Sequence, residues 1–243
     1  METILQFLSA ILESVIEADK SLLLSVNSLH SPFFDTFMFW VSDKWIWVPM
    51  YIAMFYAIVK DKQVETVFIA IGIVLTVLLC DQFSSGLCKP LFERFRPCQD
   101  PSISSMVHTV CGFKCDLYGF ISSHAANTVG VAVFTTLLFK NKLFGVFIWL
   151  WAALNCYSRM YLGVHFPGDI LCGAIAGALL GWLCFFIYQS LLKWMPQFRY
   201  NPHKTNSRSN IDFPTADIVP FIWTFIVTLF IICIFSASNI FSC

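Results

Sequence analysis

Two histidines and one carboxylate have the spacing of a reactive site within an otherwise apolar sequence. His165 precedes Asp169 by four residues, so a helix starting near Pro167 places the two side chains one turn apart. A carboxylate bonded to one imidazole nitrogen sets the tautomer and leaves the other nitrogen free to attack. Together with His124, these residues predict proton transfer or group transfer.

Three basic residues, Lys89, Arg96 and Arg159, accompany the histidines. Three cations at one site indicate an anion, and phosphate fits, because arginine gives its oxygens bidentate donors and lysine adds a point charge. Ser122 and Ser123 stand where an N-cap would, immediately before an apolar run. The N–H groups and positive dipole end of that helix would also favour phosphate.

The composition assigns the chain to membrane proteins. Of its 243 residues, 58% are hydrophobic and 12% are charged, and the mean hydropathy is +0.72. Soluble domains carry about 25% charged residues, so a soluble globule is disfavoured. Fifteen basic residues balance fifteen acidic ones, and this zero net charge gives no reason to expect a nucleic-acid partner. The expected partner is the lipid bilayer.

Six apolar stretches predict an all-α, polytopic bundle of about six transmembrane helices, since backbone polar groups find no water in lipid. The stretches are roughly 45–59, 64–82, 121–139, 143–161, 168–192 and 218–238. The first is short for a span of about 20 residues unless Trp40 and Val41 extend it. We expect Trp40, Trp45 and Trp47 at the level of the lipid headgroups.

The connections between these spans differ in charge. Those at 60–62, 140–142 and 193–217 carry eight of the fifteen basic residues and fall on one face of the bundle. The positive-inside rule makes that face cytoplasmic. The connection 83–120, the turn 162–167 and both termini then lie outside. The reactive residues, up to 80 positions apart, can therefore converge on the outer face.

The chain divides into four parts: an N-terminal segment 1–44, a core 45–192, a cytoplasmic basic loop 193–217 and a C-terminal span 218–243. Apolar residues at helical spacing from Ile4 to Ile16, with Glu13 and Glu17 on the polar side, predict an amphipathic helix in the membrane interface. Packing of that helix on the bundle is the alternative. The start of the chain lacks the basic region of a cleaved signal peptide.

Several other residues have structural interpretations. Gly173, Gly177 and Gly181 recur every four residues and predict close helix contact. Cys98 lies in the outer loop, where a disulfide is permitted, and we expect it to pair with Cys111 or Cys115. Glu93 and Arg94 are interpreted as a solvated pair, with contact between Arg94 and a lipid headgroup as the alternative. His30, His108 and His203 are expected on the surface or in loops.

The residues resemble the type 2 phosphatidic acid phosphatase (PAP2) superfamily, whose three motifs read K-x6-R-P, P-S-G-H and S-R-x5-H-x3-D. Lys89 to Pro97 matches the first motif, and Ser158 to Asp169 matches the third. In the second, Ser122 and His124 match, but Ile121 replaces the proline and Ser123 replaces the glycine. The resemblance covers about residues 45–192 and is greatest to bacterial lipid phosphatases of the undecaprenyl-diphosphate and lipid A type.

The resemblance implies a metal-independent enzyme without a cofactor, in the bacterial plasma membrane with its active site facing the periplasm. It implies that His165 is a nucleophile forming a phosphohistidine, that Asp169 orients it, and that His124 protonates the leaving oxygen. The implied phosphate-binding residues are Lys89, Arg96, Ser122, Ser123 and Arg159.

The implied substrate is a lipid phosphate or diphosphate: undecaprenyl diphosphate, lipid A, phosphatidylglycerol phosphate or phosphatidate. Alternatives on the same fold are phosphoryl transfer to an alcohol and vanadate-dependent haloperoxidase chemistry. A non-catalytic phospholipid-binding or transport protein is a third possibility, because charge within a membrane protein often marks a pathway. The gathering of charge at one face and the lack of an inverted repeat disfavour transport.

Overall fold

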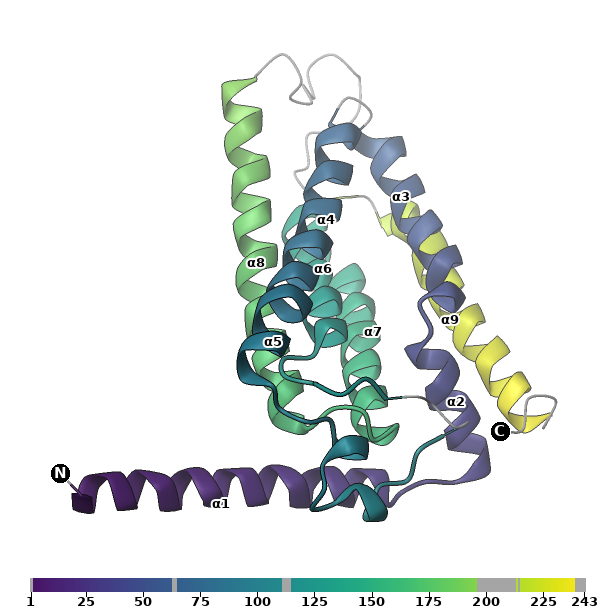
Figure 1. Cartoon of the computed structure of the whole chain (residues 1–243). Coiled ribbons are helices and arrows are strands. Elements are labelled where there is room, and N and C mark those ends of the chain that lie inside the picture. Colours follow the sequence, from purple (N-terminus) through teal and green to yellow (C-terminus); the bar gives the residue numbers. More distant parts are fainter. Residues whose placement is uncertain (1, 63–64, 111–114, 196–212, 214, 239–243) are drawn as a thin grey trace.

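The computed structural model describes residues 2–62, 65–110, 115–195, 213 and 215–238. Over these ranges the chain is helical, and its one β-type pairing is an isolated antiparallel bridge between Phe95 and Tyr118. Long helices run side by side, and one further helix lies across their end (Figure 1). The expected all-α bundle is confirmed.

The elements follow the apolar pattern closely. In chain order they are α1 (Glu2–Asn27), α2 (Pro32–Ser42), η1 (Trp45–Trp47), α3 (Val48–Lys62), α4 (Thr66–Asp81), η2 (Gln82–Cys88), α5 (Lys89–Phe92), η3 (Pro97–Gln99), η4 (Ser104–Met106), α6 (Ser123–Phe139), α7 (Lys142–Tyr161), α8 (Pro167–Trp194) and α9 (Thr215–Ala237). Each of the six expected stretches is thus occupied by a helix.

Among the described residues, three helices are long and apolar enough to cross a membrane: Thr66–Phe92, Pro167–Trp194 and Thr215–Ala237. Trp45–Lys60 and Ser123–Phe139 are apolar but shorter. The number of crossings therefore stays a prediction, although the membrane class has structural support.

The helix that begins at Thr66 is longer than expected. A π-helical segment, η2, carries α4 into α5, so the helix ends at Phe92 rather than near residue 82. The outer connection, expected from residue 83, therefore begins ten residues later, after Phe92. Lys89 accordingly projects from a helix and not from a loop. A π-segment within an α-helix is frequent at functional sites.

Helices α6 and α8 are in close contact where the three expected glycines lie. A Cβ on Gly173, Gly177 or Gly181 would stand 2.5, 2.2 or 2.3 Å from a carbonyl oxygen of α6 or its N-cap. No side chain fits at such distances, so the two backbones touch directly. The prediction of close packing through these glycines is confirmed.

Aromatic rings pack between α6, α7 and α9. Phe139 stacks on Phe144 with ring centroids 4.1 Å apart, and Phe144 meets Phe221 of α9 at 4.7 Å. Trp47 joins this core: it is fully buried, its indole N–H donates to the Val41 carbonyl, and its ring stacks on Phe225. The expected headgroup position of Trp47 is wrong, because the indole finds its partner inside the protein.

α1 is a continuous helix across the end of the bundle (Figure 1). Its first half projects beyond the other helices and exposes its apolar stripe, with Phe7 66% and Leu12 60% exposed. Its second half is docked, because Leu23 is fully buried and Asn27 donates to the carbonyls of His108 and Tyr161. Packing on the bundle therefore describes the second half of α1, and the position of its first half in the membrane interface remains a prediction.

We expect Gly177→Ala to destabilise the bundle, because its new methyl group would stand 2.2 Å from the Ala126 carbonyl oxygen. Overpacking of this kind costs about 1–3 kcal/mol, which would lower the melting temperature in detergent by several degrees. Gly145→Ala in α7 is the matched control, because its Cβ meets only a Thr136 methyl at 4.0 Å. Equal melting temperatures for Gly177→Ala and wild type would contradict the prediction.

Candidate active site

The sequence-predicted reactive residues meet at the end of the bundle where α1 lies. Lys89 comes from α5, Arg96 from the following loop, and Ser122, Ser123 and His124 from the start of α6. Arg159 is in the last turn of α7, His165 lies in the turn to α8, and Asp169 is in the first turn of α8. The predicted convergence of these segments is therefore observed.

His165 and Asp169 form the buried centre of the cluster. His165 is 1% exposed and Asp169 is fully buried. Nδ1 of His165 lies 3.5 Å from Oδ2 of Asp169, one turn along the chain. The same oxygen accepts the backbone N–H of Phe166 at 3.1 Å, which fixes the carboxylate at the start of α8.

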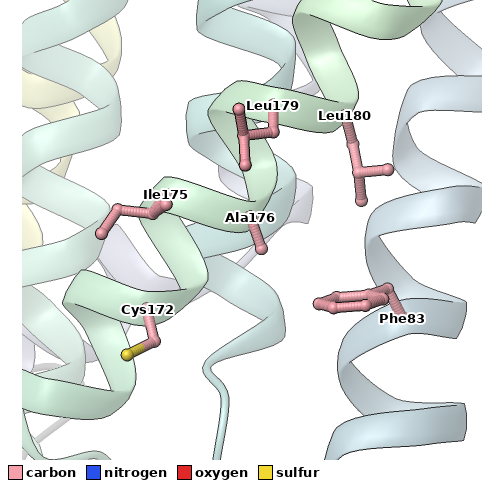
Figure 2. A pocket seen from close by; sticks show the side chains of 6 residues that line it. All are labelled: Phe83, Cys172, Ile175, Ala176, Leu179 and Leu180. Carbon is pink, nitrogen blue, oxygen red and sulfur yellow. The ribbon is translucent and has the colours of Figure 1, made fainter.

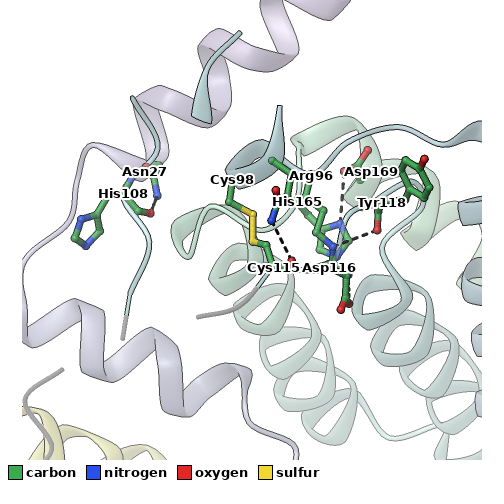
Figure 3. Close-up of a disulfide and its surroundings, with 10 residues drawn as sticks. Asn27, Arg96, Cys98, His108, Cys115, Asp116, Tyr118, His165 and Asp169 are labelled. Carbon is green, nitrogen blue, oxygen red and sulfur yellow. Dashed lines mark hydrogen bonds and ion pairs between the residues drawn. A yellow bond between two sulfur atoms is a disulfide. The ribbon is translucent and has the colours of Figure 1, made fainter. Parts of the chain in front are cut away.

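Arg96 holds the other side of the imidazole. Its Nη1 lies 3.4 Å from Nε2 of His165, and its Nε donates to the Tyr118 carbonyl. Its Nη2 pairs with the Asp116 carboxylate at 3.1 Å (Figure 3). The Nε2 atom therefore faces a guanidinium group while Nδ1 faces a carboxylate, an arrangement suited to attack on a phosphate bound by Arg96.

Two further cations lie near the His165 imidazole. Arg159 is 4% exposed and donates to the hydroxyl of Ser42 on α2. Lys89 donates from Nζ to the Ser85 hydroxyl on η2 at 3.0 Å. The positive charges of Lys89, Arg96 and Arg159 all act on His124 and His165. An anion entering here would meet several partly desolvated donors.

The start of α6 lies against the same site. Ser122 is its N-cap: the side chain accepts from the Ala125 N–H, and the Ser122 N–H donates to the Asp169 carbonyl at 3.0 Å. Ser123 and His124 are half-buried in the first turn. The predicted cap is confirmed, and its backbone bond links α6 directly to the turn that carries Asp169.

A disulfide shapes the loop over the site (Figure 3). It joins Cys98 to Cys115, one of the two expected pairings; Cys111 lies outside the described residues. Cys98 follows Arg96 by two residues and Cys115 precedes Asp116, so the crosslink holds Asp116 beside the guanidinium group.

Sequence reasoning missed several partners of the reactive residues, among them Ser42, Ser85, Arg94 and Asp116. It also missed Asp19, which pairs with Arg94. The interpretation of Glu93 and Arg94 as a solvated pair is wrong. Arg94 instead pairs with Asp169 at 2.8 Å and with Asp19 of α1 at 2.6 Å. One signal for Asp19 was present, since it lies four residues after Val15 and three before Leu22 on the apolar face of α1.

Another group of possible metal ligands, outside the predicted site, consists of His30, Asp35 and His108. The two imidazole rings stack at 4.0 Å, and Asp35 already accepts from His108 Nε2 at 3.0 Å and from the Tyr161 hydroxyl at 2.7 Å. Hydrogen bonds within the protein thus account for this cluster.

Two apolar hollows lie along α8. One of about 380 Å³ lies between α8 and Phe83 of η2 and is lined by Cys172, Ile175, Ala176, Leu179 and Leu180 (Figure 2). The other, of about 640 Å³, lies between α1 and the start of α8. Cys172 lines both hollows. Their walls suit hydrocarbon chains.

The PAP2 superfamily model matches residues 67–193, which include every predicted site residue. The chain belongs to the PAP2 superfamily. This confirms the expected family and its membrane lipid phosphatase type. The individual roles of the site residues stay predictions.

Two relatives of this PAP2 protein are lipid A 4'-phosphatases. That of Porphyromonas gingivalis is 40% identical over 178 residues, covering 73% of this chain and 75% of the relative. That of Bacteroides thetaiotaomicron is 40% identical over 182 residues, covering 74% and 81%. The undecaprenyl-diphosphatase BcrC of Bacillus subtilis is 28% identical over 93 residues, or 38% of this chain and 46% of BcrC.

Two solved structures share the fold. LpxE of Aquifex aeolicus has a TM-score of 0.51 at 24% identity, covering 68% of this chain and 92% of LpxE. A transmembrane PAP2-type phosphatidylglycerolphosphate phosphatase from Bacillus subtilis has a TM-score of 0.53 at 22% identity, covering 76% and 90%. These likenesses support the PAP2 helix arrangement.

We expect His165 to be neutral at neutral pH. Its burial, followed by the positive charges of Arg96, Arg159 and Lys89, holds its pKa well below the usual 6.5. A lowered pKa means that the ring stays unprotonated to lower pH. With five histidines in the chain, ¹⁵N-histidine NMR in detergent can follow each ring, and His165→Gln assigns the signal. Titration of His165 at or above pH 6.5 would contradict this prediction.

Proposed function

We propose that this PAP2 protein hydrolyses the terminal phosphate of a membrane lipid through a phosphohistidine on His165. The main support for this proposal is that the two nitrogens of the imidazole face groups of opposite charge. Nδ1 faces the Asp169 carboxylate, and Nε2 faces the guanidinium group of Arg96. A neutral ring held this way presents a lone pair on Nε2 to an anion that the cations bind.

In the first step, Nε2 of His165 attacks phosphorus and the bond from phosphorus to the lipid oxygen breaks. His124 gives its proton to that oxygen, so the lipid leaves as an alcohol, or as a monophosphate if the substrate is a diphosphate. In the second step, His124 takes a proton from water, the water oxygen bonds to phosphorus, and inorganic phosphate leaves His165. Arg96, Arg159, Lys89 and the start of α6 stabilise the charge on the phosphoryl oxygens.

Replacement of the usual glycine by Ser123 is compatible with this role. Ser123 is the first residue of α6, directly after its N-cap, and is half-buried. The first N–H groups of a helix lack carbonyl partners within it, whatever the side chain. Ser123 therefore keeps the backbone donor and adds a hydroxyl.

We infer that lipid A phosphate is the first substrate to test, because two relatives named lipid A 4'-phosphatase are 40% identical to this chain. The apolar hollows on either side of Cys172 support a substrate with several acyl chains. Undecaprenyl diphosphate, phosphatidylglycerol phosphate and phosphatidate are the other lipids of the proposal.

We further propose that the protein spans the bacterial plasma membrane with this site at the periplasmic face. Both described ends of the chain and the turn from α7 to α8 lie at the same end of the bundle (Figure 1). The exposed Lys140 and Lys142 belong to the connection between α6 and α7, at the end that the positive-inside rule assigns to the cytoplasm.

Purified protein in detergent should release inorganic phosphate from at least one of the four lipids without added metal. His165→Ala should abolish turnover, a loss of at least about 10³-fold, because it removes the proposed phosphoryl acceptor. Acid quenching of the wild type with ³²P-labelled substrate should trap an acid-labile phosphoprotein that His165→Ala lacks.

His30→Ala is the matched control, since His30 is an exposed histidine outside the site and should leave phosphate release unchanged. Phosphate release that persists in His165→Ala would contradict the phosphohistidine, and no release from any of the lipids would contradict the function.

The proposed orientation predicts which positions a membrane-impermeant maleimide reaches in intact spheroplasts. Ser105→Cys, exposed in the loop at the site end, should react from outside, whereas Lys142→Cys at the opposite end should react only after lysis. The unsubstituted chain measures the background of its own thiols. The reverse pattern would place the active site in the cytoplasm.

A further inference from the structure

Arg94 connects α1 to the carboxylate beside His165. Its Nη1 donates to Oδ1 of Asp169 at 2.8 Å, and its Nη2 donates to Oδ2 of Asp19 at 2.6 Å. The guanidinium carbon lies 4.2 Å from the centroid of the Phe166 ring, so stacking limits its movement. One arginine thus spans two carboxylates that are 150 residues apart in the chain.

The two oxygens of Asp169 have separate partners. Oδ2 faces the Phe166 N–H at 3.1 Å and Nδ1 of His165 at 3.5 Å, while Oδ1 faces Arg94. The contact with Arg94 therefore sets the rotation of the carboxylate and leaves Oδ2 directed toward the imidazole. Because Asp169 is fully buried, its negative charge also needs a nearby cation.

Asp19 fixes Arg94 from the other side. Its Oδ1 accepts the Gly168 N–H at 2.7 Å, and its Oδ2 accepts from Arg94. The approach is close, since a Cβ on Gly168 would stand 2.9 Å from the Asp19 carboxylate. Asp19 thus binds both the first turn of α8 and the arginine that pairs with Asp169.

We propose that Arg94 and Asp19 are positioning residues for the phosphatase reaction, with Asp19 on α1 orienting Arg94, Arg94 orienting Asp169, and Asp169 orienting His165. This proposal rests on the proposed function, since it assigns a role relative to nucleophilic His165. The two carboxylates and one guanidinium group together carry one negative charge. That charge stabilises the positive charge that the imidazole gains as it bonds to phosphorus.

A purely structural role would make Asp19 one of several contacts that dock α1. Lys20, the next residue, provides the comparison, because it also ties α1 to the outer loop: Nζ donates to Ser102 at 2.7 Å and pairs with Asp100 at 3.3 Å. Lys20→Gln weakens docking but leaves the pairing of Arg94 with Asp169 intact. Glu17→Gln, on the exposed side of α1, controls for a change of charge.

We expect Arg94→Ala to lower kcat about 10- to 100-fold, by analogy with the loss of groups that orient metal ligands. Asp19→Asn acts one contact further from His165 and should lower kcat less, about 3- to 10-fold. KM should stay within about 2-fold, because the residues proposed to bind phosphate are unchanged. Guanidinium ion added to Arg94→Ala should restore part of the lost kcat. Arg94→Lys should be intermediate, since one ammonium group replaces two separate N–H donors.

Lys20→Gln and Glu17→Gln should keep the wild-type kcat. Equal losses of kcat in Lys20→Gln and Asp19→Asn would overturn the proposal, because docking of α1 alone would then explain both. A wild-type kcat in Arg94→Ala, or a loss that appears only in KM, would also overturn it. Failure of the proposed function is distinguishable, since the wild type itself would then release no phosphate.

Discussion

The site depends on direct contact between the backbones of α6 and α8. Gly173 lies so close to Ser122 that a Cβ would stand 2.5 Å from its carbonyl oxygen, and the Ser122 N–H donates to the Asp169 carbonyl. Glycine alone permits this approach, since a larger residue would separate the two helices. The contact places the first turn of α6, which carries His124, against the first turn of α8, which follows His165. The same contact therefore determines both the packing of the two helices and the geometry of the site.

The second constraint is the balance of buried charge. Arg96 and Arg159 are about 5% and 4% exposed, and desolvation makes such cations costly unless an anion is near. Asp116 partly neutralises Arg96 from the loop that the Cys98–Cys115 disulfide holds. Asp116 is itself 85% exposed, so solvent weakens the pairing and a better-placed anion can displace it. A phosphate with two or three charged oxygens would satisfy these donors better than one exposed carboxylate.

The site residues could be predicted because their spacing along the chain carries the chemistry. His165 and Asp169 are one turn apart, and the alternation of spans brings their turn to the same end as Arg96 and Ser122. The length of the continuous helix Thr66–Phe92 could not be predicted in the same way, because a π-segment has no hydropathy signal. Trp47 was misplaced because an indole suits either a headgroup or a buried carbonyl, and only packing decides which. Hydropathy thus predicts where helices lie, whereas contacts between them depend on shape.

Arg94 and Asp19 show the same limit at the site. Arg94 has an ordinary local explanation as a solvated ion pair with Glu93, and its pairing with Asp19 spans 75 residues. Asp19 nevertheless conflicts with its surroundings, since it interrupts the apolar face of α1 between Val15 and Leu22. An acid on an apolar face must lie against a cation or a free N–H to be tolerated. Arg94 and the Gly168 N–H are those partners, so the exception in the pattern of α1 marks where this helix meets the active site.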